Sequence, residues 1–258
     1  MKKKVEKISQ QIVDIISQWS AVKTITIAEA ADEELISPYF FMSIDVYYKG
    51  NLLSAKKRRA CFGDTATFES SNYGNKDRFL YEDLPIRLEY KNMDRIDTII
   101  DSNNDVQYIV RETGTYLFYR IKNNRVLFQK SGWLNEVREN ITNLPDSYWD
   151  PMIKTCASSL EHQLGDLSAA VMEDDALFYL RSLAGWINTL CSIIFLMNHE
   201  FEPSGRRMLN QLFALRNLPE NFKGRFDCLI REDSEFGPER KQEIAKLLTS
   251  QIIGMIRR

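Results

Sequence analysis

Two acidic residues lie at the centre of segments with the composition of β-strands, and together they could bind metal ions. Asp45 lies in the middle of residues 42–48, and Glu89 lies within residues 84–91. Carboxylate oxygens are the ligands that Mg²⁺ prefers, and two such ions roughly 4 Å apart can neutralise charge on phosphate oxygens. Two acids on neighbouring strands would therefore suit chemistry at a phosphate group.

A run of four cations, residues 56–59, follows the first of these segments and includes Arg58 and Arg59. Arginine is well suited to phosphate because its guanidinium can form two parallel hydrogen bonds. The run could therefore hold phosphate near Asp45. Such a run, however, most often forms a solvated helix face.

Length and composition indicate an ordinary globular protein of one or two domains. The chain has 258 residues, of which 44% are hydrophobic and 27% charged, and its formal net charge is −2. A hydrophobic core is therefore available, and wholesale disorder is not expected. Such a balance gives no general attraction to nucleic acid or to an anionic membrane, so a nucleic-acid partner is not expected.

Neither a secretory signal nor a membrane span is expected. The basic residues 2–4 are followed by an amphipathic segment rather than by an apolar core of about 7–15 residues. The most apolar run, residues 186–197, is too short to cross a bilayer and predicts a buried helix. The four cysteines form no CxxC pair and there are only two histidines, which indicates reduced thiols in a cytoplasmic protein without a zinc site.

Residues 1–145 have a mixed helix and strand character. Apolar residues spaced by three and four predict a helix over 4–19, and residues 52–62 predict a short helix or the return strand of a hairpin, the helix being favoured. A further short helix is expected over 94–100. The expected strands are 22–27, 39–48, 65–69, 79–91 and the two arms of a hairpin, 114–119 and 126–129.

Almost everything after Pro145 has helical periodicity. The helices are expected over residues 149–164, 167–198, 205–216, 221–230 and 238–257. We therefore predict an α+β protein with two domains: a mixed-sheet domain over residues 1–145, followed by an all-helical domain over residues 146–258.

The order of these elements resembles that of the nucleotidyltransferase-like superfamily. A helix, a strand, a loop, a strand with Asp45 and a later strand with Glu89 follow the order of its minimal catalytic domain. The second half is similar to the helical domain of two-domain nucleotidyltransferase-like proteins, and more distantly to that of antibiotic-modifying nucleotidyltransferases. The resemblance covers most of the chain and rests also on the segments 115–120, 126–132, 195–203, 206–207 and 218–219.

The resemblance implies a role for each acidic residue. Asp45 corresponds to the second acid of an Asp-x-Asp pair, which holds magnesium ions that bind a nucleoside triphosphate. Glu89 corresponds to the third carboxylate, a metal ligand that also serves as the catalytic base. The same resemblance places Asn198, Arg206 and Arg207 where the helical domain faces the cleft, in contact with nucleotide or acceptor.

The chain departs from the family pattern at two places. Ser43 stands at the first position of the acidic pair, and it carries no charge for a magnesium ion. The turn after the first strand is Glu29-Ala30-Ala31, without the glycine that lets phosphate approach backbone N–H groups. Loss of one carboxylate from a two-metal site costs orders of magnitude in rate.

Each candidate residue also has a purely structural interpretation. Asp45 and Glu89 could form ion pairs with arginine or lysine on neighbouring strands. Asn198 could cap the end of a long helix, and Arg206 and Arg207 could lie on the surface of the next one.

These residues leave two functions open, and whether the chain is an enzyme is not decided by its sequence. The first is a divergent nucleotidyltransferase fold with lost or weakened catalysis, used as a ligand-binding or interaction module. The second is an active magnesium-dependent enzyme that moves a nucleoside monophosphate from a triphosphate to a hydroxyl of a small molecule or protein. The sequence identifies neither the acceptor nor the oligomeric state.

Overall fold

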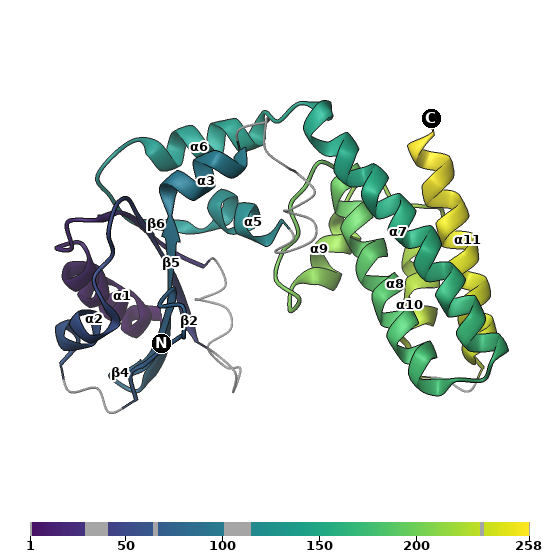
Figure 1. Cartoon of the computed structure of the whole chain (residues 1–258), viewed down its shortest axis with the longest axis horizontal. Coiled ribbons are helices and arrows are strands. Elements are labelled where there is room, and N and C mark those ends of the chain that lie inside the picture. The colour runs from purple at the N-terminus through teal and green to yellow at the C-terminus, as the bar shows by residue number, and fades with distance from the viewer. Residues whose placement is uncertain (1, 29–40, 64–66, 101–114, 233–234, 258) are drawn as a thin grey trace. The chain divides into compact units, whose positions relative to one another are not determined.

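The computed structural model describes residues 2–28, 41–63, 67–100, 115–232 and 235–257 (Figure 1). They belong to two compact units: residues 1–104 with 120–143, and residues 105–119 with 144–258. The turn expected at 29–31 and the acidic residues at 32–34 lie outside the described residues. That the chain divides into two independently folding domains at residue 145 stays a prediction.

The first unit contains a mixed sheet with the strand order β3-β4-β5-β2-β1-β6. β2 and β5 are parallel, whereas the other neighbouring strands are antiparallel. The strands are β1 (Val22–Ile27), β2 (Met42–Tyr48), β3 (Glu69–Ser70), β4 (Lys76–Tyr81), β5 (Leu84–Asn92) and β6 (Arg125–Gln129). The helices of this unit are α1 (Lys2–Ile16), α2 (Ala55–Cys61), α3 (Met93–Ile100) and α6 (Trp133–Thr142).

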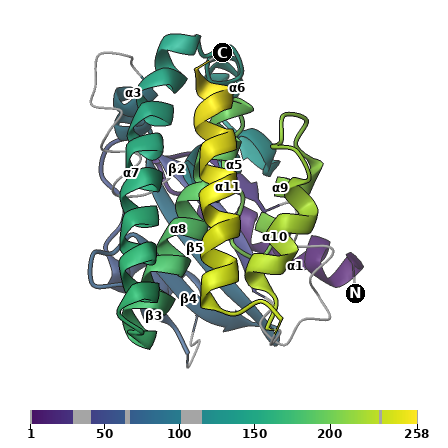
Figure 2. The same ribbon diagram turned by 90° about the vertical axis from the view of Figure 1, so that its right-hand side faces the viewer.

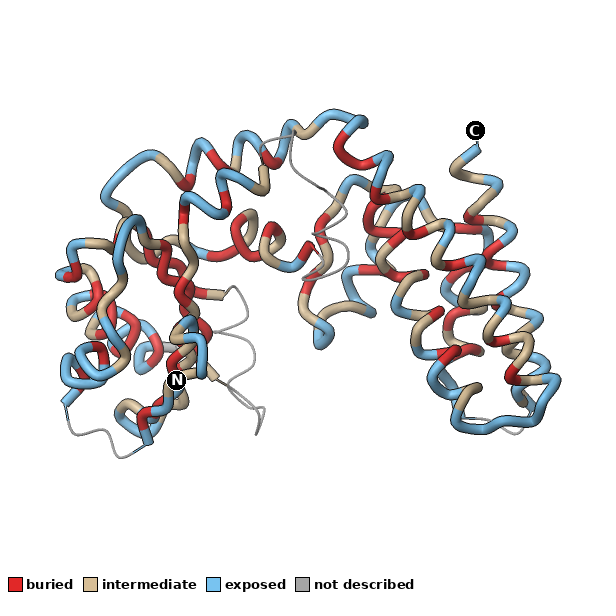
Figure 3. The backbone as a smooth tube through the Cα atoms, in the orientation of Figure 1, coloured by how far each residue is buried: buried red, intermediate tan, exposed pale blue. Residues whose placement is uncertain are grey.

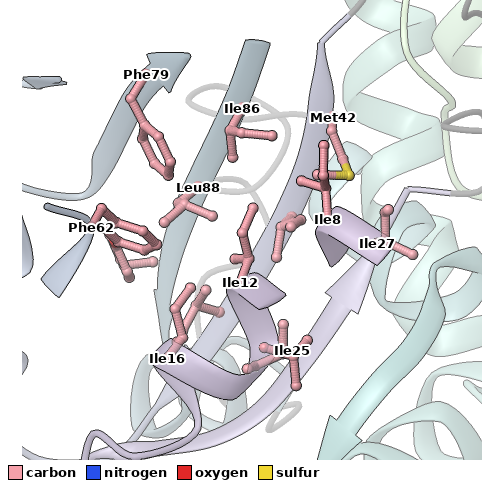
Figure 4. Close-up of a cluster of buried hydrophobic side chains, with 14 of the residues drawn as sticks. Ile8, Ile12, Ile16, Ile25, Ile27, Met42, Phe62, Phe79, Ile86 and Leu88 are labelled. Atoms are coloured by element: carbon pink, nitrogen blue, oxygen red, sulfur yellow. The ribbon is translucent and has the colours of Figure 1, made fainter. Parts of the chain in front are cut away.

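The two faces of this sheet differ in chemistry because successive side chains of a strand point to opposite sides. Met42, Ile44 and Val46 of β2 lie on one face, which packs against the apolar stripe of α1 (Figure 4). We call this the core face; β5 adds Ile86 and Leu88 to it. The intervening residues of β2 and β5 lie on the other face, which we call the polar face.

The predicted helices 4–19, 52–62 and 94–100 are confirmed as α1, α2 and α3. α2 begins at Ser54, whose side chain accepts a hydrogen bond from the backbone N–H of Lys57. The extended residues predicted over 79–91 form two strands, β4 and β5, and the strand predicted over 84–91 around Glu89 is β5. Glu82 and Asp83 separate them with φ angles of 45° and 65°, the left-handed conformation that a two-residue hairpin turn requires.

The hairpin predicted from arms 114–119 and 126–129 is wrong in its first arm. Residues Tyr116–Asn123 form a helix, α5, and only the second arm is a strand, β6. The aromatic residues of this segment suggested a strand by propensity. Tertiary contacts decide otherwise, since Phe118 is buried and its ring lies 5.3 Å from that of Phe201.

The second unit is helical, as expected. Its helices after residue 144 are α7 (Asp146–Met172), α8 (Ala176–Met197), α9 (Met208–Ala214), α10 (Phe222–Ile230) and α11 (Pro238–Ile256). α7 and α8 form the most extensive helix pair, and α11 packs against α7 and α10 (Figure 2). The long helical stretch predicted over 167–198 is interrupted at Glu173–Asp175, where Asp174 has a φ of 53° and Asp175 caps α8.

The apolar run 186–197 lies within a buried helix, as predicted. Trp186, Leu190, Ile193 and Ile194 of α8 are fully buried. Figure 3 colours the buried stretches of the chain red. α8 as a whole has 22 residues and by length and composition alone could cross a membrane, but half of its apolar window is buried within the protein. That burial is typical of the central helix of a folded bundle.

The four cysteines are unpaired thiols with different surroundings, and this predicts a labelling pattern. Burial, and then the nearby Glu202 carboxylate, raise the pKa of Cys156 to about 11 and that of Cys191 to about 12. At pH 8 only about one in a thousand Cys156 thiols would be ionised, and the thiolate is the reactive form. We expect a disulfide reagent to titrate exposed Cys61 first and Cys228 more slowly, whereas Cys156 and Cys191 react only after denaturation.

The control for this labelling is Cys61→Ser, which should remove the fastest phase and leave the others unchanged. Rapid reaction of all four thiols in the native protein would contradict the burial of Cys156 and Cys191.

Candidate functional site

The structure brings Asp45 and Glu89 together on the polar face of the sheet. β2 and β5 are parallel neighbours, and the Cα partner of Asp45 is Glu89. Both side chains point to the same side, because each alternates with the core residues of its strand. This is the pair of acids that the sequence predicted.

Cations, however, occupy the coordinating positions of Asp45. Its Oδ1 lies 2.7 Å from Nη2 of Arg120, and its Oδ2 lies 3.0 Å from Nζ of Lys91. Oδ2 also accepts a hydrogen bond of 3.0 Å from Nδ2 of Asn124. Asp45 is fully buried, so these groups rather than water balance its charge.

Arg120 joins the two strands that carry the acids. Its Nη1 lies 3.2 Å from Oε2 of Glu89, while its Nη2 contacts Asp45 and donates a hydrogen bond of 2.8 Å to Oγ of Ser43. One guanidinium therefore binds both carboxylates and the serine that stands at the first position of the family's acidic pair. These side chains are joined by direct contacts, and we call them the polar cluster: Ser43, Asp45, Glu89, Lys91, Arg120 and Asn124.

Two helices position Arg120 and Asn124 of the polar cluster. Arg120 lies in α5, and Asn124 follows its last residue, so the two lie four positions apart on one helix face. Arg138 of α6 donates hydrogen bonds to the carbonyl oxygens of Ile121 and Asn124 at the end of α5. A cation at a helix C-terminus binds the unpaired carbonyls and interacts favourably with the helix dipole.

The polar cluster is shielded from water. The side chain of Arg120 is 4% exposed and that of Lys91 is 13% exposed. Burial lowers the pKa of Lys91, and Arg120 lowers it further, although the Asp45 carboxylate acts in the opposite direction. Burial, reinforced by the Asp45 charge, raises the pKa of Tyr47 on the same face, which keeps its phenol neutral.

The residues that surround Asp45 do not fit a pair of magnesium ions. Magnesium needs near-octahedral oxygen ligands at about 2.0–2.1 Å, whereas the two oxygens of Asp45 already lie 2.7 Å and 3.0 Å from the cationic nitrogens of Arg120 and Lys91. A metal ion would have to displace Arg120 and Lys91, or share a buried space with two positive charges. Among the described residues, moreover, no three His, Cys, Asp or Glu side chains are grouped as a metal site.

Glu89 gives the polar cluster a defined pH dependence. Burial raises the pKa of Glu89, but Arg120 foremost, then Lys91 and Lys76, outweigh burial and hold it below its usual value. An acid with a lowered pKa in the folded state stabilises the protein above its unfolded pKa of about 4.3 and loses that contribution as pH falls through the folded pKa. Glu89→Gln should therefore lower the free energy of unfolding by about 1.5–3 kcal/mol near pH 7.

That difference should begin to shrink as the pH is lowered below about 4, where the carboxylate takes up a proton in the unfolded chain, and it should vanish once the pH passes the lower folded pKa of Glu89. Urea denaturation at several pH values measures it. The exposed acid Glu6 offers a control, and Glu6→Gln should leave the profile of the wild type unchanged. A Glu89→Gln deficit that stays constant down to pH 3 would contradict the charge interaction with Arg120.

Arg58, the first predicted phosphate contact, lies on the core face rather than beside Asp45. Its Nε lies 2.7 Å from Oδ2 of Asp77, and its guanidinium stacks over the ring of Tyr90 at 4.5 Å. Tyr90 belongs to the hydrophobic core cluster, and Asp77 is the partner of Leu88 in the sheet. Arg58 is therefore a buried ion-pair residue, and the structure does not bring it to the polar cluster.

Arg59, the second predicted phosphate contact, is exposed on α2 next to Arg58. Three of the four cations of residues 56–59 thus lie on a solvated helix face, and the fourth is buried. The prediction that Arg59 binds phosphate stays a prediction.

The other predicted contacts belong to the second unit. Asn198 caps α8: its Nδ2 donates to the carbonyl oxygens of Ile194 and Asn217, and its Oδ1 accepts from the backbone N–H of Asn217. These bonds give it a structural role at the turn after α8. Arg206 is exposed, and Arg207 precedes α9 as its N-cap residue.

Sequence reasoning missed Arg120 and Asn124, the two side chains that complete the polar cluster. Arg120 directly follows residues 114–119, which the sequence predicts as a strand, so its four-residue spacing to Asn124 does not stand out. A helical interpretation of residues 116–123 would have placed both on one face. Lys91 lies two positions after Glu89 on the same strand, and it forms an ion pair with Asp45.

Comparison with known proteins gives a fold and a partial sequence match. Residues 112–206 match a domain of unknown function, DUF4037. Comparison with curated protein sequences finds no match. The structure resembles that of a nucleotidyltransferase-like protein from Exiguobacterium sibiricum 255-15, with a TM-score of 0.52 and 10% sequence identity over 97% of this chain and 74% of that one.

The predicted fold class is therefore confirmed: the chain has an α+β, nucleotidyltransferase-like fold with a mixed sheet followed by a helical region. At 10% sequence identity the structural likeness shows the fold alone. The chemistry has to be inferred from the residues of this chain.

Proposed function

We propose that this chain is a divergent nucleotidyltransferase-fold protein without metal-dependent transfer activity, which acts in the cytoplasm as a ligand-binding or protein-interaction module. The observation that supports this proposal is the pair of cations on Asp45. In the active members that the sequence resembles, that acid holds magnesium; here Arg120 and Lys91 neutralise it.

Electrostatics explains why the two arrangements exclude each other. A carboxylate that binds a metal ion must present its oxygens to the ion, and a nearby guanidinium competes for the same oxygens and repels the ion. Arg120 binds Asp45 and Glu89 at once, so both acids would have to be released. The serine at position 43, which offers no charge to a metal, is consistent with the same interpretation.

In this proposal the polar cluster stabilises the folded structure and does not take part in a reaction. Its charges tie β2 and β5 to α5 at the place where the fold would otherwise bind ions. Free thiols among the described cysteines agree with the proposed cytoplasmic location. No membrane or nucleic-acid partner is proposed.

A test combines thermal shift with pyrophosphate release. The purified protein is mixed with each ribonucleoside triphosphate and Mg²⁺ or Mn²⁺, beside Asp45→Asn and Glu89→Gln variants. The proposal expects no metal-dependent stabilisation and no pyrophosphate release above that of the variants.

The opposite result would establish the alternative, an active magnesium-dependent nucleotidyltransferase. In that case a triphosphate with metal would stabilise the wild type, pyrophosphate would be released, and both effects would be lost in Asp45→Asn. Arg59→Ala and the double variant Arg206→Ala, Arg207→Ala would then show whether these predicted contacts bind the nucleotide.

A further inference from the structure

The second unit has a groove between α10 and α11 that the polar cluster does not involve. Its volume is about 540 Å³, within the size range of small-molecule sites. α10 and α11 lie side by side (Figure 2). The lining residues that matter below are Gly224, Arg225, Cys228, Phe236, Ile244 and Leu247.

Arg225 brings a positive charge to this groove that no carboxylate neutralises within the described ranges of the chain. Its Nη1 donates to two neutral acceptors, the carbonyl oxygen of Glu220 and, at 2.8 Å, Oε1 of Gln251. These bonds fix the guanidinium. The other charges of the lining, Arg240 and Glu243, pair with each other at 2.7 Å and cancel.

The remaining wall of the groove is apolar and partly open to solvent. Phe236 and Ile244 are half-buried, and Leu247 is 44% exposed. Gly224 adds free space, since a Cβ built on it would meet no atom within 4 Å. Apolar surface of this kind gains stability when a ligand covers it.

We propose that this groove binds an organic monoanion, a carboxylate carried on an apolar body. The carboxylate would contact the guanidinium of Arg225, whose planar fork matches two carboxylate oxygens. The apolar body would lie along Phe236, Ile244 and Leu247. A single uncompensated positive charge matches one negative charge, and a cationic ligand of the same shape would be repelled.

Octanoate and octylamine are suitable probes because they share a chain and differ in charge. Thermal shift of the full chain should show stabilisation by millimolar octanoate and none by octylamine. In a Cys61→Ser background, octanoate should also slow alkylation of Cys228, which lines the groove.

Two substitutions separate binding from folding. Gly224→Leu places a side chain in the groove at a position where an added Cβ meets no atom, and it replaces a helical glycine by a better helix former, so the protein should stay folded while octanoate binding is lost. Arg225→Met should weaken binding by about tenfold or more, and Arg225→Lys by less. Gly165→Leu in α7, where a Cβ also meets open space, is the matched control and should bind octanoate normally.

Three outcomes would overturn the proposal. One is equal stabilisation by octanoate and octylamine, which would indicate apolar binding without a role for Arg225. Another is octanoate binding that persists in Gly224→Leu. The third is no shift by octanoate and no protection of Cys228. None of these outcomes bears on the polar cluster, so the two proposals can fail separately.

Discussion

Replacing Asp45 by alanine is expected to lower the free energy of unfolding of the first unit by about 3–5 kcal/mol, because it leaves the buried charges of Arg120 and Lys91 without their partner. Both cations contact Asp45 at 3.0 Å or less, and Asp45 has no exposed surface. Glu89 alone would remain to balance the two charges. Urea denaturation followed by hydrogen exchange in β1, β2 and β5 measures the loss in the unit concerned.

This result also distinguishes the two functional interpretations. Acids that are grouped to bind metal repel one another in the metal-free protein, so removing one of them leaves stability unchanged or increases it. An acid that is bound by cations behaves in the opposite way. Asp94→Ala, which breaks an exposed ion pair with Lys49, is the control and should cost less than about 1 kcal/mol. A stability loss at Asp45 no larger than that of the control would contradict the ion cluster.

Arg58→Ala is expected to have an effect of similar size on the opposite face of the sheet, about 3–5 kcal/mol. Asp77, fully buried, would keep only the hydroxyls of Ser70 and Tyr90 as hydrogen-bond donors. Arg58 also donates to the carbonyl oxygens of Leu53 and Gly74, which would lose those bonds. Burial lowers the pKa of Arg58, but the interactions with Asp77 and Tyr90 together outweigh burial and raise it, so the guanidinium stays charged.

Arg59→Ala is the matched control for this substitution, because Arg59 is the next residue of the same helix and is exposed. It should change the free energy of unfolding by about 0.5 kcal/mol or less. Chemical denaturation of the two variants side by side is sufficient. If both variants had the same stability, Arg58 would be a surface residue like its neighbour, and its assignment to the core face would be wrong.

The parts of the fold that sequence could predict are those set by local periodicity. The apolar stripe of α1 and the alternation in β1 and β2 each reflect one packed face, so short windows are sufficient to identify them. The segment of α5 shows the limit of this reasoning. Its aromatic residues favour a strand by local preference, whereas in the folded protein the segment is a helix whose Phe118 is buried against Phe201.

The candidate site shows the same division between local and distant information. Asp45 and Glu89 could be paired from sequence because each occupies the middle of a strand in a recognised order. Arg120 could not, since it reaches Asp45 from 75 positions further along the chain through the placement of α5. The positive charge of Arg120, which neutralises the two acids, is thus brought to them by the tertiary structure. Residue spacing in the sequence does not predict this contact.

The fate of the basic run at residues 56–59 follows from helix geometry. Four consecutive residues of a helix point in different directions around its axis, so they cannot act as one phosphate-binding face. One of them, Arg58, points toward the sheet and forms an ion pair with Asp77. The others remain in solvent.

The dependence of nucleotide affinity on metal ions tests the central claim most directly, because it requires no knowledge of an acceptor. Calorimetric titration with each ribonucleoside triphosphate, in Mn²⁺ and again in EDTA, compares the wild type with Asp45→Asn. If Arg120 and Lys91 have replaced the metal ions, Mn²⁺ will not increase the affinity for any triphosphate. Affinity that rises with Mn²⁺ in the wild type and loses this dependence in Asp45→Asn would contradict the account.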